Sequence, residues 1–395
     1  MTALAPMRHT DRRDTSTPWI EARRLAHRLA VALDAEEVPL AAAAGRTLAA
    51  ALTARVMVPG FDNAAMDGYA VRGPGPWRLV GGVLAGQSHT FSLSPGEAFD
   101  IATGALLPRG ADRVVPYEVA ERVGDSVCAP PAGKCHIRRA GEYVSAGDTV
   151  LPRGAVLTAA ALGLAASVGV DTLAVRRRPA VRVLVTGDEL IGAGVPTEGL
   201  VRDAVGPAIT TLVPAWGADL LEVRWVRDQP RAALVGAVQE SLNDADITVV
   251  CGSSSVGPAD GLHACHAEVA ATIHIDGVAC RPGHPQSLAS VGTKWIVGLP
   301  GNPFAALVAA HTVLRPLLDG LLGRPLPEQP GAHLVGDPQP DARVTRLVPV
   351  RWHDRAVHVI GGDHPGHLAA AAQAAALAVI PPDWHAGDAV SIIPL

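Results

Sequence analysis

Aromatic and charged residues are both scarce in this sequence, at 4% and 18% of its 395 residues. The formal net charge is only −5, so the chain has no excess of basic residues with which to cover nucleic acid or an anionic membrane surface. We therefore expect neither nucleic acid nor a membrane among its partners.

Cysteine is also rare, and the five cysteines include no Cys-X-X-Cys pair. This odd number and irregular spacing argue against a disulfide framework and favour a reducing compartment. The N-terminal segment carries acidic residues and no apolar core, unlike a secretory signal. The longest run without a charged residue or a histidine, residues 154–170, is shorter than a membrane span usually needs. We therefore predict a cytoplasmic globular protein.

Glycine and proline are abundant instead, with 41 and 33 residues, and they punctuate the chain unevenly. Between residues 51 and 142, short alternating apolar runs are separated by turns such as "GPGP" and "SPGE". This pattern is typical of a small β-rich domain. We assign the flanking segments, 15–50 and 143–178, to a linker domain with N-terminal helices and an Ala-rich helix after Leu157.

The first helix is expected between Thr15 and Leu33, where apolar residues recur at helical spacing. Ser16 or Thr17 is expected to cap it, because hydroxyl groups accept hydrogen bonds from the free N–H groups of a first turn. Pro18 suits that first turn because its missing N–H is not needed there.

From residue 179 to 327, strand and helix patterns alternate. The expected strands are 180–187, 219–226, 246–252 and 294–301, and the expected helices are 207–218, 230–245, 261–270 and 303–322. Such alternation predicts a three-layer α/β domain with a mostly parallel sheet. Residues 328–395 return to short strands and are expected to form a C-terminal β domain. The predicted fold class is therefore multidomain α/β and β.

Four loops follow these strands and should meet at one edge of the sheet, where α/β proteins bind their ligands. They are residues 186–190 ("TGDEL"), 226–230 ("VRDQP"), 251–260 ("CGSSSVGPAD") and 298–303 ("GLPGNP"). All four are rich in Gly, Pro, Ser or acidic residues. Their convergence predicts a binding site.

Each loop alone has two interpretations. Asp188 and Glu189 suit a metal site or acid–base catalysis, but equally a solvated, helix-capping turn. The hydroxyl groups of residues 253–255 suit an anion site at a helix N-terminus, or only a cap. Arg281 and His284, in "CRPGHP", suit a phosphate or oxyanion, or a solvated basic turn.

Several motifs cover nearly the whole chain in a characteristic order. They are "PGFDNAAMDGYAVR", "IATGALLPRGADRVVPYE", "IRRAGEYVSAGD", "VRVLVTGDEL", "SSSVGPAD", "RPGHP" and "GLPGNP". In these motifs the sequence resembles the molybdopterin molybdenumtransferases, the MoeA-type molybdenum insertases that include the gephyrin E domain.

The resemblance implies insertion of molybdate into adenylylated molybdopterin, with release of AMP and with Mg²⁺ as cofactor. It also implies a homodimer of four-domain subunits, with an active cleft shared between subunits, and a molybdopterin adenylyltransferase as a possible partner.

The resemblance also implies site residues. Those implied for catalysis are Asp67, Thr103, Glu189, Asp228 and Asp260, with Asp228 and Asp260 as Mg²⁺ ligands and Gly68 as a hinge beside Asp67. Those implied for substrate binding are Ser255, Gly257, Arg281, His284, Pro300, Asn302 and Pro303.

The sequence departs from the family pattern at several of these places. The departures are Tyr143 for an acid, Ala204 and Val205 for Ser-Asn, Ser253 for glycine, Arg281 and His284 for two lysines, Pro365 for serine and Ala375 for a polar residue. Two main hypotheses follow: an active insertase with a remodelled cleft, or a divergent paralogue that binds a pterin, nucleotide or protein partner or acts on another adenylate. A pure scaffold is the third.

Overall fold

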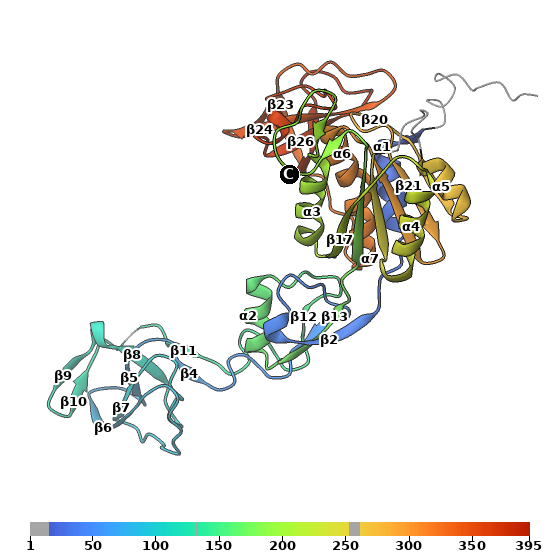
Figure 1. The fold of residues 1–395 in the computed structure, drawn as a ribbon. Helices are drawn as coiled ribbons and strands as arrows, with labels where there is room; N and C mark the ends of the chain where they lie inside the picture. Colours follow the sequence, from blue (N-terminus) through green and yellow to red (C-terminus); the bar gives the residue numbers. More distant parts are fainter. Residues whose placement is uncertain (1–15, 132, 253–260) are drawn as a thin grey trace, which may run out of the picture. The chain divides into compact units, whose positions relative to one another are not determined.

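The computed structural model describes residues 16–131, 133–252 and 261–395 (Figure 1). They form two compact units. One is the inserted unit, Glu37–Val175, and the other is the main unit, which comprises the chain up to Glu36 and from Arg176 to Leu395.

The inserted unit is built from short strands. Its six-stranded sheet has the order β8-β5-β7-β6-β10-β9, with β5 Gly68–Val71, β6 Trp77–Val83, β7 Glu97–Ile101, β8 Arg113–Pro116, β9 Glu121–Val123 and β10 Ser126–Cys128. Three two-stranded pairs accompany it: β4 Asn63–Ala64 with β11 Ile137–Arg138, β3 Leu52–Thr53 with β12 Thr149–Leu151, and β2 Ala35–Pro39 with β13 Thr172–Arg176. The Ala-rich helix is α2, Ala159–Ser167, whose amide N–H at Ala161 donates to the Thr158 hydroxyl.

Gly68 is not a hinge, contrary to the expectation from sequence. It is a buried strand residue, in register with Ile101 on β7 and Pro116 on β8. A Cβ at this position would lie 2.0 Å from the Val115 carbonyl oxygen. Glycine is required because neighbouring backbone comes too close for a side chain.

The main unit contains a six-stranded sheet of order β17-β14-β18-β22-β21-β19. The parallel strands are β14 Ala180–Thr186, β17 Asp219–Val226, β18 Ile247–Cys251 and β22 Lys294–Leu299, and the antiparallel ones are β21 Ser287–Val291 and β19 Thr272–Asp276. The helices are α1 Trp19–Leu29, α3 Val205–Ala215, α4 Ala232–Asp244, α5 Leu262–Glu268, α6 Pro303–Ala309 and α7 Arg315–Leu321, with a π-helical segment, Ala310–Leu314, joining the last two.

Alternate strand residues face opposite layers, as the pleat of a strand dictates. Val183 and Val249 pack with α1, α3, α6 and α7 in one core. Leu184 and Val250 pack with α4 and α5 in another. The structure confirms the predicted fold class, with a three-layer α/β domain.

A seven-stranded sheet completes the main unit, in the order β1-β20-β24-β25-β23-β27-β26. Its strands are β1 Thr17–Pro18, β20 Val278–Arg281, β23 Gly331–Val335, β24 Thr345–His353, β25 Ala356–Val359, β26 Ala376–Ile380 and β27 Ala389–Pro394, and a short helix, α8 Leu368–Ala371, lies before β26. The C-terminal region is β-rich as predicted, and it also recruits two strands from earlier in the chain.

The predicted N-cap of the first helix is wrong. Thr17 pairs with Val278 as part of β1, and Pro18 takes the cap position without a side-chain hydrogen bond. Tertiary contacts anchor the helix instead, because the Trp19 indole N–H donates to the Thr312 hydroxyl at 3.0 Å. Long-range strand pairing has overridden a local capping preference.

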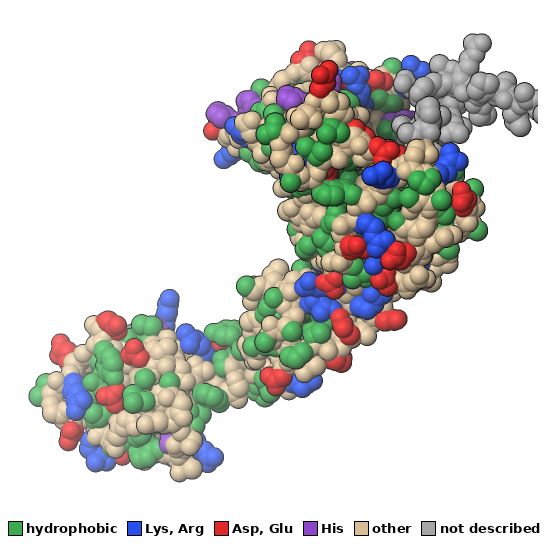
Figure 2. Space-filling view, in the orientation of Figure 1, with side chains coloured by type: hydrophobic (Ala, Val, Ile, Leu, Met, Phe, Trp, Pro, Cys, Tyr) green, Lys and Arg blue, Asp and Glu red, His purple; other side chains and the backbone are tan. Residues whose placement is uncertain are grey.

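Charges of both signs intermingle on the surface in Figure 2. Exposed Arg28, for example, lies 3.3 Å from Glu21. In the described chain, Pro303–Leu321 is long and apolar enough to cross a membrane, but 89% of its most apolar window is buried inside the protein. It is the central core helix of the main unit.

Candidate active site

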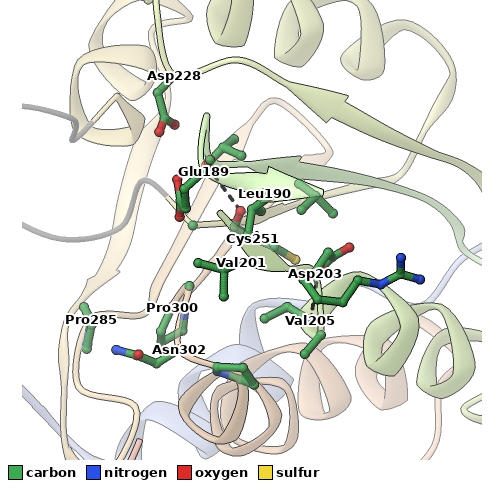
Figure 3. Close-up of a pocket in the computed structure, with 18 residues that line it drawn as sticks. Glu189, Leu190, Val201, Asp203, Val205, Asp228, Cys251, Pro285, Pro300 and Asn302 are labelled. Carbon is green, nitrogen blue, oxygen red and sulfur yellow. Dashed lines mark hydrogen bonds between the residues drawn. The ribbon is translucent and has the colours of Figure 1, made fainter. Parts of the chain in front are cut away.

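A cavity of about 480 Å³ opens at the carboxyl ends of the four parallel strands (Figure 3). Gly187 and Glu189 reach it from β14, Asp228 from β17, and Gly252 from β18. Residues 300–303, after β22, complete that side of the wall. The loops therefore converge as the sequence predicts, because parallel strands end at a common edge.

Gly252 allows two of these loops to come together. Its φ is +95°, and a Cβ would lie 2.6 Å from the Thr186 hydroxyl oxygen and 2.7 Å from the Thr186 carbonyl oxygen. The Thr186 hydroxyl donates to the carbonyl of Cys251 at 3.3 Å. Only glycine combines this φ with so close an approach of backbone.

Among the described residues, the cavity wall carries three carboxylates: Glu189, Asp203 and Asp228. Asp203 is buried, and its Oδ1 accepts the N–H groups of Val205 and Gly206, both at 2.9 Å. It therefore caps α3 and occupies the positive end of that helix. In Figure 3, Asp228 points its carboxylate toward the side of the cavity where Glu189 lies.

Glu189 and Asp228 fit a Mg²⁺ site. Mg²⁺ is usually held by one or two carboxylates, completed by water and substrate phosphate oxygens, and does not need an all-protein cage. Among the described residues, no cluster of three or more metal-ligating side chains occurs. Asp260, which was predicted to bind Mg²⁺ together with Asp228, lies outside the described residues, as do Ser253, Ser255 and Gly257.

The start of α6 forms another part of the wall. Asn302 precedes the helix and Pro303 is its first residue, as the "GLPGNP" pattern predicts. The next two backbone N–H groups, of Phe304 and Ala305, both donate to the Pro365 carbonyl, at 2.9 and 3.1 Å. A loop of the C-terminal region thus closes this helix end.

The two predicted cations, Arg281 and His284, bind within the protein. The Arg281 Nε lies 3.1 Å from Asp363, and the His284 Nδ1–H donates to the Val278 carbonyl at 2.9 Å. Neither is among the described residues that line the cavity, whereas Pro285, in the same turn, is. In this structure the Val278 carbonyl and Asp363 hold these two side chains, and their role in substrate binding stays a prediction.

The wall also contains residues for which no individual role was predicted, although most of them lie in the predicted loops or beside them. They are Val185, Thr186, Gly187, Leu190, Val201, Arg202, Asp203, Ala204, Val205, Cys251, Gly252, Pro285 and Gly301. Several come from a small ribbon in which β15 Leu190–Ile191 pairs with β16 Val201–Arg202. A run of two residues is too short for a strand pattern. Burial raises the pKa of the Cys251 thiol well above its usual range, so this thiol is protonated at neutral pH.

The inserted unit holds the remaining two predicted catalytic residues. Asp67 is exposed, and its Oδ1 accepts the backbone N–H of Thr103 at 2.6 Å. This bond, and a second from the Thr103 hydroxyl, lower the pKa of Asp67 below its usual value. Asp67 and Thr103 thus form a hydrogen-bonded pair whose carboxylate is ionised at neutral pH.

Comparison with known proteins decides the family. Residues 17–169 match the "MoeA N-terminal region (domain I and II)" and residues 182–320 the "Probable molybdopterin binding domain". The molybdopterin molybdenumtransferase of Nostoc sp. is 34% identical over 373 residues, which is 88% of this chain and 85% of the relative. The chain belongs to the molybdopterin molybdenumtransferase family.

Further relatives agree with this assignment. Molybdopterin molybdenumtransferase 2 of Mycobacterium tuberculosis is 36% identical over 319 residues, covering 74% of this chain and 76% of the relative. A molybdopterin biosynthesis MoeA protein of Pyrococcus horikoshii superposes with a TM-score of 0.74 at 26% identity, over 95% of this chain and 97% of its own. The resemblance to molybdenumtransferases is thereby confirmed.

Within this family, the departures fall into different settings. Ala204 and Val205 line the cavity at the start of α3, while Pro365 contributes the carbonyl that closes α6. Tyr143 is 59% exposed in the inserted unit, with its backbone N–H donating to the Val58 carbonyl. Ala375 donates its backbone N–H to Val350 and precedes β26.

Proposed function

We propose that this protein inserts molybdate into adenylylated molybdopterin, with water cleaving the link to AMP and AMP as the leaving product. The similarity to proteins named molybdopterin molybdenumtransferase over 88% of the chain carries this proposal. The cavity at the carboxyl ends of the four parallel strands supports the proposal, because α/β proteins bind their ligands at this edge of the sheet. Its wall carries carboxylates. The activity is that of a transferase of molybdenum cofactor biosynthesis. A paralogue without insertase activity is not favoured by these relatives.

The residues of the cavity have proposed roles. Asp228 and Asp260, the two predicted ligands, would hold Mg²⁺ together with Glu189, and the bound ion would neutralise phosphate charge. Asn302 offers an amide to the substrate, and Pro300 and Pro303 fix the turn that presents it. Ser255 and Gly257 are proposed to contribute to an anion site.

Asp67 and Thr103 are proposed to act on the same substrate. Because its pKa is lowered, Asp67 is an acceptor of hydrogen bonds rather than a donor of protons at neutral pH. Thr103 orients it through both its backbone N–H and its hydroxyl group. The pair is therefore suited to positioning a water molecule or a hydroxyl group of the substrate.

The proposal extends to the assembly and the setting. We propose a cytoplasmic homodimer that accepts its substrate from a molybdopterin adenylyltransferase. We also propose four domains per subunit, with the boundaries given by the sequence: 15–50 with 143–178, then 51–142, 179–327 and 328–395. Sedimentation of the purified protein at twice the subunit mass of 40.6 kDa is expected.

The test is AMP release from adenylylated molybdopterin by the purified protein with Mg²⁺, with and without molybdate. Molybdate-dependent release is expected, and E189Q should reduce it while D354N should not. Asp354 is an exposed residue in the turn between β24 and β25, so D354N makes the same loss of one negative charge away from the cavity. Release at the uncatalysed rate by the folded wild-type protein would refute the proposal.

A further inference from the structure

A tyrosine and a second carboxylate lie beside the Asp67–Thr103 pair in the inserted unit. The Tyr117 backbone N–H donates to the Asp67 carbonyl at 3.3 Å, so the two residues lie opposite one another where β8 ends and β5 begins. The Tyr117 hydroxyl group donates to a carboxylate oxygen of Asp100 on β7. Its ring packs edge-on against the buried ring of Tyr69, with 5.2 Å between the ring centroids. These contacts fix the position of the phenol.

The Asp67 carboxylate and the Tyr117 hydroxyl group both lie at the end of β7. Asp67 Oδ1 accepts the backbone N–H of Thr103, two residues beyond the last residue of that strand. The Tyr117 hydroxyl group binds Asp100, the last residue but one of the same strand. Asp67, Thr103 and Tyr117 are all exposed, so this corner is open to water.

The protonation states make both groups acceptors. Partial burial raises the pKa of Tyr117 above its usual value, and the hydrogen bond to Asp100 and the negative charges of Asp100 and Asp67 raise it further. The phenol is therefore protonated at neutral pH, and because its one hydrogen is directed to Asp100, its oxygen can only accept. A carboxylate has about four acceptor positions, so ionised Asp67 keeps some free beside its two bonds from Thr103.

We propose that Tyr117 is a further catalytic residue, whose hydroxyl oxygen accepts one hydrogen of a water molecule while Asp67 accepts the other. Two acceptors at fixed positions orient a water molecule, and its lone pairs then point away from both. Asp100 is the positioning residue, because it holds the phenol hydrogen away from that water. The inference rests on the proposed function, in which water cleaves the link to AMP, and deepens it.

The oriented water molecule suits that cleavage. When its oxygen bonds to phosphorus, the bond to the leaving phosphate breaks and that phosphate departs as an anion. One proton of the water passes to the Asp67 carboxylate, and the other hydrogen stays in the product. Tyr117 takes up no proton, because its phenol is already protonated.

The experiment is steady-state AMP release from adenylylated molybdopterin by the full-length protein, with Mg²⁺ and molybdate. Y117F removes the hydroxyl group and keeps the ring that packs on Tyr69. Its kcat is expected to fall about tenfold, the loss that one hydrogen bond to the reacting water accounts for. Its KM should stay within about twofold of the wild type, because the water and not the substrate loses a contact. A wild-type kcat in folded Y117F would overturn the inference.

D100A tests the positioning role of Asp100 and keeps the inference testable if Y117F does not fold. Without Asp100 the phenol hydrogen is free to turn toward the water, so kcat should again fall about tenfold. The double variant Y117F/D100A should lose no more than either single variant, because the two residues act as one unit. D100N should retain most of the rate, since its amide oxygen still accepts the phenol hydrogen. Losses that multiply in the double variant, or a D100N rate as low as that of D100A, would contradict the proposed role.

Y69F is the matched control, because it removes a hydroxyl group from the neighbouring ring and keeps the ring contact. Its kcat should remain within about twofold of the wild type. An equal loss in Y69F would show that the rate depends on the ring packing alone, and the inference would be wrong. If the wild type releases no AMP, the proposed function fails and this inference with it. If the wild type is active and Y117F is equally active, only this inference fails.

Discussion

Gly252 offers the sharpest test of how the cavity is built. In G252A, the new Cβ would lie 2.6 Å from the Thr186 hydroxyl oxygen and 2.7 Å from its carbonyl oxygen, and the carbonyl belongs to a sheet strand that cannot turn away. The left-handed φ of +95° adds a penalty of about 1–2 kcal/mol for a residue with a Cβ. Overpacking of this kind adds about 1–3 kcal/mol. We expect a total loss of about 2–5 kcal/mol.

Differential scanning calorimetry is the appropriate assay, because the chain has two compact units and a single free energy of unfolding is not defined for it. For a unit of this size, the loss predicts that the main-unit transition falls by on the order of 10 °C. The transition of the inserted unit should stay where it is, because the substitution lies outside it.

G194A is the matched control for backbone strain. Gly194 also has a left-handed φ, +81°, but nothing lies within 4 Å of its ideal Cβ position. Its substitution should cost only the conformational part, about 1–2 kcal/mol. Equal shifts for G194A and G252A would refute the argument from close approach. If the main-unit transition temperature of G252A equalled that of the wild type, the close approach of Gly252 to Thr186 would itself be refuted.

Three further substitutions test other contacts. D203A removes the cap of α3 and should cost about 1 kcal/mol, seen as a lower main-unit transition temperature, with D203N largely restoring it. T103A removes one of the two hydrogen bonds that lower the pKa of Asp67, so NMR titration should show that pKa rising toward its ordinary value. Burial lowers the pKa of His311 to about 3. Below about pH 6.5 the unfolded chain therefore binds a proton at this histidine that the folded chain does not bind. Stability should therefore fall between about pH 6.5 and pH 3, by at most about 1.4 kcal/mol per pH unit, and less steeply in H311Q, as followed by thermal melts.

The sheet and its functional edge were predictable from the sequence because they follow from local patterns. Buried parallel strands such as β14 and β18 are short apolar runs, and their carboxyl ends must share one edge. This shared edge is enough to place Glu189, which follows β14, and Asp228, which follows β17, in one cavity. Glycine-rich loops after those strands marked the same positions.

The errors come from contacts between segments that are distant in the sequence. Thr17 was expected to cap a helix, but it pairs with Val278. Gly68 was taken as a hinge, yet the Val115 carbonyl is what excludes a side chain there. The local sequence shows which functional groups a residue carries. It does not show which residue, distant in the sequence, will contact them in the fold.

The closed helix ends bear directly on how the cavity recognises an anionic substrate. The first N–H groups of α3 bind Asp203, and those of α6 bind Pro365, so neither helix offers its positive end to a phosphate. Within the described part of the wall, Arg202 is the only basic residue, and it shares that wall with three carboxylates. An adenylylated pterin carries several negative charges, which such a wall alone would repel. A Mg²⁺ ion held by these carboxylates would resolve this conflict, because it would supply positive charge toward the phosphates. Removal of Mg²⁺ should therefore abolish substrate binding as well as turnover, and calorimetric binding that persists with excess chelator would contradict this reasoning.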